Sequence, residues 1–158
     1  MPIRSAAKAL MYENGKILLN SHKTESGRIY YDLPGGGQRQ YETMEEAVIR
    51  EVLEETGYTV EVVRFQCIAE EISEDPAMQT QYPEYTHRIM HIFLVRRITA
   101  GKAEICELDF EQTGSVWVTP EEADQLDLVP RQLCGQMRKV IESETPLYLG
   151  SLKLRQQL

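Results

Sequence analysis

The sequence predicts an α/β protein in which a mixed sheet carries helices on either side. Three observations support this prediction: an Asn-Gly hairpin signal near the start, strand-like runs before and after a well-capped helix, and two further helix starts near the end. The length of 158 residues fits one domain, 1–158, and we expect the tail from about Thr145 to be peripheral.

The predicted strands are runs rich in Val, Ile, Tyr and Phe that are bounded by turn residues. These runs are Ile3–Tyr12, Lys16–Ser21, Ile29–Leu33, Tyr58–Ile72, Arg88–Ile98 and Val116–Val118. Asn14-Gly15 joins the first two runs into a predicted β-hairpin, because this dipeptide suits a tight two-residue turn. The polar segments Glu74–Tyr85 and Lys102–Thr113 predict irregular loops.

A central helix is predicted over Met44–Thr56. Thr43 and Glu46 have the spacing of a capping box, and Gly57 stands where a helix ends in a left-handed conformation. At 3.6 residues per turn, an apolar stripe runs along one flank of this helix. The stripe consists of Val48, Ile49, Val52 and Leu53.

Two more helices are predicted towards the C-terminus. Thr119 is a suitable N-cap for a short helix that begins at Pro120 and continues to about Leu126. Pro130 precedes a second helix over Arg131–Ser143, whose apolar residues recur at helical spacing.

Three carboxylates, Glu51, Glu54 and Glu55, lie together near the C-terminal end of the central helix. They repel one another and face the negative end of the helix dipole, so the arrangement is unfavourable unless something offsets it. Arg50 offsets only part of this charge. The pattern therefore predicts a hard cation, Mg²⁺ or Mn²⁺, whereas a solvated acidic face is the alternative.

The run Gly35-Gly36-Gly37 just upstream favours the metal interpretation. Because glycine has no side chain, its backbone amide or carbonyl can approach an ion or a phosphate closely. We therefore expect the three glycines to contribute to substrate binding.

Nine positions within 23 residues match the signature G-x5-E-x7-R-E-U-x-E-E-x-G-U, so the chain resembles the MutT-like Nudix hydrolases. The matching residues are Gly36, Glu42, Arg50, Glu51, Val52, Glu54, Glu55, Gly57 and Tyr58. Tyr58 departs from the pattern, since the family usually has an aliphatic residue there. The resemblance implies an α/β/α sandwich and metal-dependent hydrolysis of a diphosphate linkage in a nucleoside di- or triphosphate or a nucleotide sugar.

The resemblance also implies roles for these residues. Glu54 and Glu55 would be the principal metal ligands, and Glu51 either a further ligand or the general base. The carbonyl of Gly35 or Gly36 would add a ligand, while Arg50 would orient the carboxylates at the catalytic centre.

Members of the family often supply one more acidic residue from a later loop, as a base or a ligand. We expect Glu111 to be this residue, and its competitors are Glu104, Glu107 and Asp109. The long segment before Arg88 offers Tyr82, Tyr85 and His87 as groups that would stack on or hydrogen-bond a base or sugar; a plain surface insertion is the alternative.

Composition excludes several classes of protein. A net charge of −8, from 17 basic and 25 acidic residues, disfavours binding to a long nucleic acid and so disfavours an RNA-decapping enzyme. There is no signal for a membrane partner or a secretory leader, so a cytoplasmic location is expected. Cys67, Cys106 and Cys134 indicate neither disulfides nor zinc, and we expect them to be reduced and packed.

Two other functions remain open: a non-catalytic Nudix-like module that binds a nucleotide and regulates another process, and an isomerase of prenyl diphosphates that would use a cysteine such as Cys67. The sequence leaves the substrate undetermined, because the subfamily markers are absent or displaced. A homodimer is common among similar proteins.

Overall fold

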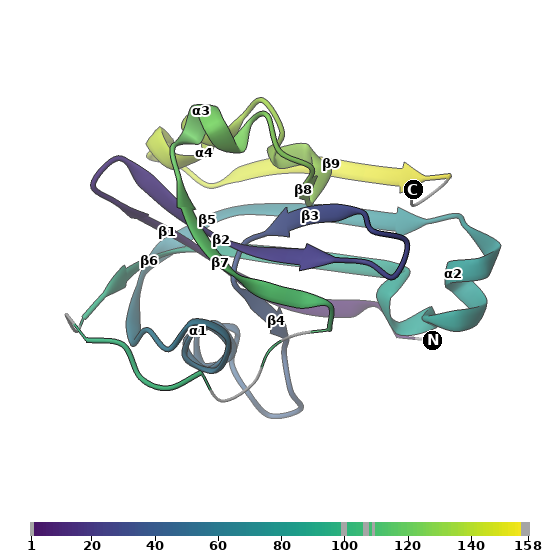
Figure 1. The fold of residues 1–158 in the computed structure, drawn as a ribbon, viewed down its shortest axis with the longest axis horizontal. Coiled ribbons are helices and arrows are strands. Elements are labelled where there is room, and N and C mark those ends of the chain that lie inside the picture. The colour runs from purple at the N-terminus through teal and green to yellow at the C-terminus, as the bar shows by residue number, and fades with distance from the viewer. Residues whose placement is uncertain (1, 99–100, 106–107, 109, 156–158) are drawn as a thin grey trace.

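The computed structural model describes residues 2–98, 101–105, 108 and 110–155, and in this part of the chain helices flank a single sheet (Figure 1). Its strands are β1 (Arg4–Glu13), β2 (Lys16–Lys23), β3 (Ile29–Asp32), β4 (Gly35–Gly37), β5 (Val60–Ser73), β6 (His87–Arg97), β7 (Gln112–Val118), β8 (Leu128–Val129) and β9 (Leu147–Leu154). Its helices are α1 (Met44–Thr56), α2 (Pro76–Gln81), α3 (Pro120–Ala123) and α4 (Met137–Glu142), with 3₁₀ turns η1 (Pro83–Tyr85) and η2 (Arg131–Leu133).

The sheet is mixed, as predicted. Its strand order is β8-β3-β2-β1-β6-β5-β9, with β4 paired to β1 and β7 paired to β2. Strands β1 and β6, β3 and β8, and β5 and β9 run parallel, while the remaining pairs are antiparallel.

Two apolar cores lie on opposite faces of this sheet. Leu10 of β1 packs towards α3 and α4, whereas its neighbours Ala9 and Met11 pack towards α1. Alternate residues of a strand point to opposite faces, so a strand buried on both sides reads as a continuous apolar run. Figure 1 shows α1 on one side of the sheet and α3 and α4 on the other, which confirms the α/β/α sandwich.

The predicted hairpin and central helix are confirmed. Asn14 and Gly15 both have positive φ, 50° and 77°, as a tight hairpin turn between β1 and β2 requires. Helix α1 has the predicted bounds and the predicted capping box, and Gly57 ends it in the left-handed region at φ 76°. The predicted apolar stripe is wrong at Leu53, which is 36% exposed, because the buried face of α1 is turned towards Glu55 and Thr56.

Three local predictions are wrong. The glycine run forms β4 rather than a loop, because it pairs with β1. The segment Glu74–Tyr85 contains α2 and η1, since Asp75 caps a turn that starts at Pro76. The helix expected over Arg131–Ser143 is divided between η2 and α4, where Gly135 has φ 73° and breaks the helical path.

The segment after Thr145 is not a peripheral tail but supplies β9 at the edge of the sheet. It runs parallel to β5, and Leu147 and Leu149 pack against the core beneath α4. Within the described residues, no helix is long and apolar enough to cross a membrane.

Candidate active site

The acidic end of α1 forms one wall of a pocket of about 200 Å³, which we call the carboxylate pocket. Its lining residues come from α1, from the glycine strand β4, from the start of β1 and from loops. They are Arg4, Gly36, Gly37, Arg39, Arg50, Glu51, Glu54, Glu55, Leu108 and Phe110. The structure therefore brings the three predicted metal carboxylates and two of the three glycines into one site.

Arg50 organises this pocket. Its guanidinium donates to both oxygens of Glu42, at 2.6 and 3.0 Å, to Glu51 at 2.7 Å and to Glu54 at 3.0 Å. The hydrogen bond from Arg50 lowers the pKa of Glu42 to about 2. Arg39 adds an ion pair to Glu54 at 3.7 Å, so two cations contact the three carboxylates of Glu42, Glu51 and Glu54. The carboxylates outnumber the cations paired with them, which suits a further cation.

Glu55 is held differently, because it is 3% exposed and its charge is buried. One of its oxygens accepts hydrogen bonds from Asn20 Nδ2 at 2.7 Å and from the Gly35 amide at 2.9 Å. A buried carboxylate needs such donors to stay ionised. The amide of Gly35 therefore stabilises Glu55, and the Gly35 carbonyl accepts a hydrogen bond from Lys8 Nζ at 2.7 Å. Both backbone groups of Gly35 are thus bonded to protein side chains.

Gly36 lies directly against Glu51. A Cβ at this position would come within 2.6 Å of a Glu51 carboxylate oxygen, so a side chain here would displace the Glu51 carboxylate from its position. In the described residues, no three His, Cys, Asp or Glu side chains converge as a ready-made metal cage. The donor set nevertheless fits Mg²⁺, which keeps several waters and takes few protein carboxylates together with substrate phosphates.

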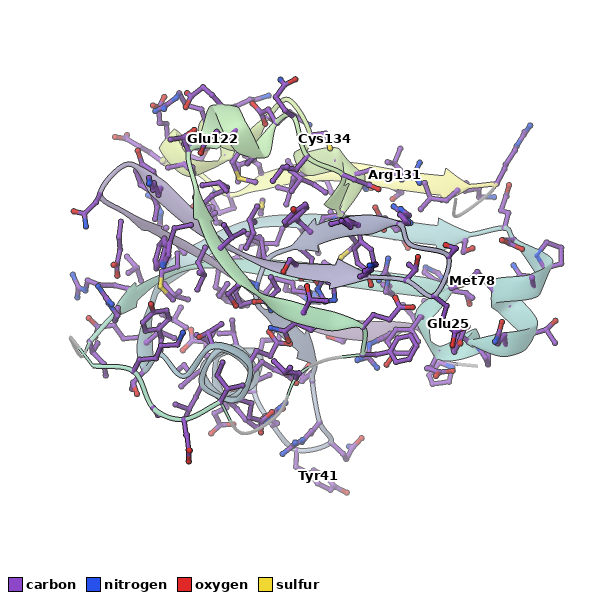
Figure 2. The ribbon with its side chains drawn as sticks, viewed as in Figure 1. Glu25, Tyr41, Met78, Glu122, Arg131 and Cys134 are labelled. Carbon is purple, nitrogen blue, oxygen red and sulfur yellow. The ribbon has the colours of Figure 1, made fainter. Side chains whose placement is uncertain are left out.

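A larger cavity of about 280 Å³ adjoins the carboxylate pocket, and Arg4, Gly36 and Phe110 line both. The walls of the larger cavity carry aromatic rings and arginines, among them Arg28, Tyr30, Tyr82, Tyr85, Arg88 and Arg131. Figure 2 labels Met78, on α2, and Arg131, at the start of η2, which line this cavity from separate elements. Such a mixture suits a ligand with a flat apolar part and anionic groups.

A buried polar group forms part of the same wall. Asp32 accepts from Lys8 Nζ at 2.9 Å and pairs with His22 Nε2 at 2.8 Å. Burial would raise the pKa of Asp32, but the charges of Lys8 and His22 outweigh it and hold the pKa below its ordinary value. Burial would lower the pKa of His22, yet the hydrogen bond and charge of Asp32 raise it.

Tyr30 sits between two of these wall groups. The imidazole of His22 stacks on its ring at 4.7 Å between centroids, and the Arg28 guanidinium lies 5.3 Å from the same ring. Asp127 fixes Arg28 through two hydrogen bonds, at 2.7 and 3.0 Å. The cavity wall is therefore preorganised by its own contacts.

Of the three side chains predicted to contact the substrate, two line the larger cavity and one does not. Tyr82 and Tyr85 line the larger cavity, and their role in substrate binding stays a prediction. His87 is not among the lining residues; its Nε2 lies 2.7 Å from a carboxylate oxygen of Glu70.

Glu111 lies on the wall of the larger cavity and not in the carboxylate pocket. The Tyr30 hydroxyl donates to its carboxylate at 3.4 Å, and its backbone adopts φ 63°. Of its competitors, Glu107 and Asp109 lie outside the described residues.

The two cysteines in the described part of the chain offer no nucleophile at the site. Cys67 is buried in the core, and burial raises the pKa of its thiol to about 12. Cys134 is exposed, contrary to the expectation that it is packed, and Cys106 lies outside the described residues. This removes the support that Cys67 gave to the isomerase hypothesis.

A family model described as the NUDIX domain matches residues 2–142. The chain belongs to the NUDIX family. The sequence-based hypothesis of a MutT-like Nudix hydrolase is confirmed at that level, and with it the interpretation of the protein as an enzyme.

Similar proteins agree with this assignment. The nucleoside triphosphatase NudI of Enterobacter sp. (strain 638) is 29% identical over 127 residues, covering 79% of this chain and 88% of the relative. The mutator MutT protein of Bacillus halodurans has a TM-score of 0.68 at 20% identity, covering 97% of this chain and 91% of the other. An ADP-ribose pyrophosphatase of Streptococcus suis 89-1591 has a TM-score of 0.59 at 19% identity, covering 96% and 100%.

Sequence reasoning missed several residues of this Nudix site: Arg4, Lys8, His22, Arg28, Tyr30 and Asp32. One signal was available at Lys8, which is a single charge within an otherwise apolar strand and therefore needs a partner. His22 and Tyr30 are brought together by strand register, since His22 of β2 lies opposite Tyr30 of β3. The sequence does not encode that pairing in any local pattern.

Proposed function

We propose that this Nudix hydrolase cleaves the diphosphate linkage of a nucleoside triphosphate, with a divalent cation held at the carboxylate pocket. Nucleotide sugars and ADP-ribose form the second substrate class. The observation that carries the proposal is that two cavities adjoin, one holding the carboxylates of α1 and the other lined by aromatic rings and arginines. They share Arg4, Gly36 and Phe110.

The carboxylate pocket would hold the cation through Glu54, Glu55 and the carbonyl of Gly36. When bound, a divalent ion neutralises the charge of the phosphoryl oxygens and lowers the pKa of water. The side chains of the protein supply the positioning of the carboxylates and the general base. Arg50 keeps the carboxylates in position through the hydrogen bonds described above.

Glu51 is the proposed general base. One of its oxygens accepts from Arg50, and the carboxylate lies against Gly36, where the two cavities meet. The placement of Glu111 on the wall of the larger cavity makes it a better candidate for contact with the substrate than for taking the proton.

The larger cavity would receive the nucleoside. An aromatic face such as that of Tyr82 stacks on any base, and the arginines suit phosphate oxygens. The relative from Enterobacter is named a nucleoside triphosphatase, which supports triphosphates as the first choice. The structural neighbour from Streptococcus suis is named an ADP-ribose pyrophosphatase, which supports the second class.

Glu54→Gln tests the proposal, because it removes one ligand charge while keeping the size of the side chain. We expect turnover of nucleoside triphosphates with Mg²⁺ to fall by about 10²-fold or more, as loss of an electrostatic group at the reacting centre does. Phosphate or pyrophosphate release is measured for the four ribonucleoside triphosphates, ADP-ribose and a UDP-sugar, with and without EDTA.

Glu45→Gln is the matched control, since Glu45 lies exposed in the first turn of the same helix. It should leave turnover unchanged. Full activity of Glu54→Gln, or of the wild type in EDTA, would contradict the metal-dependent mechanism. A wild type that binds nucleotides but hydrolyses none of the panel would favour the non-catalytic binding module instead.

A further inference from the structure

Arg4 stands at the junction of the two cavities. It is the first residue of β1, and its side chain lines both the larger cavity and the carboxylate pocket. A group bound there would be next to a nucleoside on one side and next to the carboxylates of α1 on the other. In a nucleotide, the group with these two neighbours is the phosphate attached to the nucleoside.

The guanidinium of Arg4 is held in place without being neutralised. It lies over the Tyr85 ring, 4.7 Å from the centroid, in a cation–π contact. Within the described part of the chain no carboxylate forms an ion pair with it, whereas Arg28 is paired with Asp127 at 2.7 Å and Arg88 with Glu71 at 2.9 Å. A guanidinium stacked on a ring still offers its in-plane N–H donors to an anion.

Gly37 makes room for this position. A Cβ on Gly37 would lie 2.8 Å from an Nη atom of Arg4 and 3.0 Å from its Cζ, so a side chain there would displace the guanidinium. The absence of a side chain at Gly37 thus accommodates Arg4, whereas the absence of one at Gly36 accommodates Glu51. The side chain of Arg4 is packed between Gly37 and Tyr85.

We infer that Arg4 binds the nucleoside-proximal phosphate of the substrate, donating hydrogen bonds from its guanidinium to the phosphate oxygens. This assignment rests on the proposed function, because it takes the larger cavity as the nucleoside site. It also explains how an acidic protein accepts an anionic substrate beside a group of carboxylates: Arg4 supplies positive charge at the boundary.

The test compares nucleoside 5′-monophosphates with their nucleosides, so that only the phosphate differs. Wild type, Arg4→Ala and Arg4→Lys are titrated calorimetrically in EDTA with AMP, GMP, CMP and UMP and with the four nucleosides. We expect wild type to bind at least one monophosphate about 10- to 100-fold more tightly than its nucleoside, as a charge-assisted contact implies. Arg4→Ala should lose this preference, and Arg4→Lys should keep part of it, since lysine retains the charge but not the planar fork.

Arg96→Ala is the matched control, because Arg96 is exposed on β6, pairs with Glu61 and lines neither cavity. It should bind like wild type. The inference is overturned if no monophosphate binds wild type better than its nucleoside, if Arg4→Ala keeps the preference, or if Arg4→Ala weakens both ligands equally. Because the titration needs no turnover, an inactive wild type that shows the phosphate preference would defeat the proposed hydrolysis and leave the role of Arg4 standing.

Discussion

At the scale of single residues, two compact groups of charged side chains have opposite arrangements: in one a cation is surrounded by carboxylates, and in the other a carboxylate is surrounded by cations. Arg50 gathers Glu42, Glu51 and Glu54 around one guanidinium, which keeps acidic side chains together where a helix end disfavours them. Asp32 does the reverse, because one buried carboxylate gathers the cations Lys8 and His22. The first group gathers negative charge at the carboxylate pocket, and the second fixes the wall of the larger cavity.

The His22–Asp32 pair predicts a pH dependence of stability. The folded pKa of His22 is raised above its ordinary value of about 6.5, so protonated His22 stabilises the fold. This contribution is fully present below about pH 6.5 and is lost as the pH rises through the raised pKa. The free energy of unfolding of wild type, measured with urea between pH 5.5 and 8.5, should therefore decline over this range relative to His22→Gln.

The same pair can be observed directly by NMR titration of the His22 imidazole. Its midpoint should lie above about 6.5. A midpoint at or below that value, or parallel pH profiles of stability for wild type and His22→Gln, would show that burial outweighs Asp32.

At the scale of elements, α1 is defined by its two ends. Thr43 and Glu46 satisfy backbone donors at the start, and the Gly57 amide donates to the Leu53 carbonyl at the exit. The exit matters for the site, because Glu54 and Glu55 lie in the last turn before it. A change in the path of the chain at Gly57 would move both carboxylates.

Gly57→Ala should therefore destabilise the protein by about 2 kcal/mol or more. The added Cβ meets a left-handed backbone, which costs L-residues roughly 1–2 kcal/mol, and it would lie 2.2 Å from the Ala103 carbonyl oxygen. Gly101→Ala is the control, since no atom of the described residues lies within 4 Å of its added Cβ. Equal urea midpoints for the two variants would refute this account of the helix exit.

The elements predicted correctly are those whose signals are local. The caps of α1 and the Asn14-Gly15 turn act within a few residues, so the sequence indicates them directly. The glycine strand β4 and the short strand β8 were not predicted, because each exists only through its pairing with a distant partner. The break at Gly135 was missed since apolar spacing continued across it.

At the scale of the whole molecule, the fold extends beyond the segment that matches the family. The match ends at residue 142, yet β9 follows at Leu147–Leu154 and pairs with β5. Its backbone also accepts a hydrogen bond from Gln132 Nε2 at Gly150, which ties η2 to the sheet edge. We regard β9 as part of the cooperative unit.

A chain shortened to end at Pro146 should lose several kcal/mol of stability, a large share of the 5–15 kcal/mol typical of a domain. It loses the pairing with β5 and the apolar contacts of Leu147 and Leu149 with the core. Urea denaturation measures the loss, and a chain ending at Arg155, which keeps all of β9, is the control. If both shortened chains unfold at the wild-type urea midpoint, β9 does not contribute to the stability of the domain.

The sequence alone determined the bounds of α1, the acidic character of its end and the family, because these depend on residue types at fixed short spacing. The tertiary structure decided which protein groups hold each carboxylate and that Lys8 donates a hydrogen bond to the Gly35 carbonyl. It also decided that a cavity lined by aromatic rings and arginines adjoins the carboxylate pocket. These properties depend on strands that meet across long stretches of chain, as when Asn20 reaches Glu55 and Arg4 reaches Tyr85. No local pattern specifies such meetings, since they arise only when the sheet is assembled.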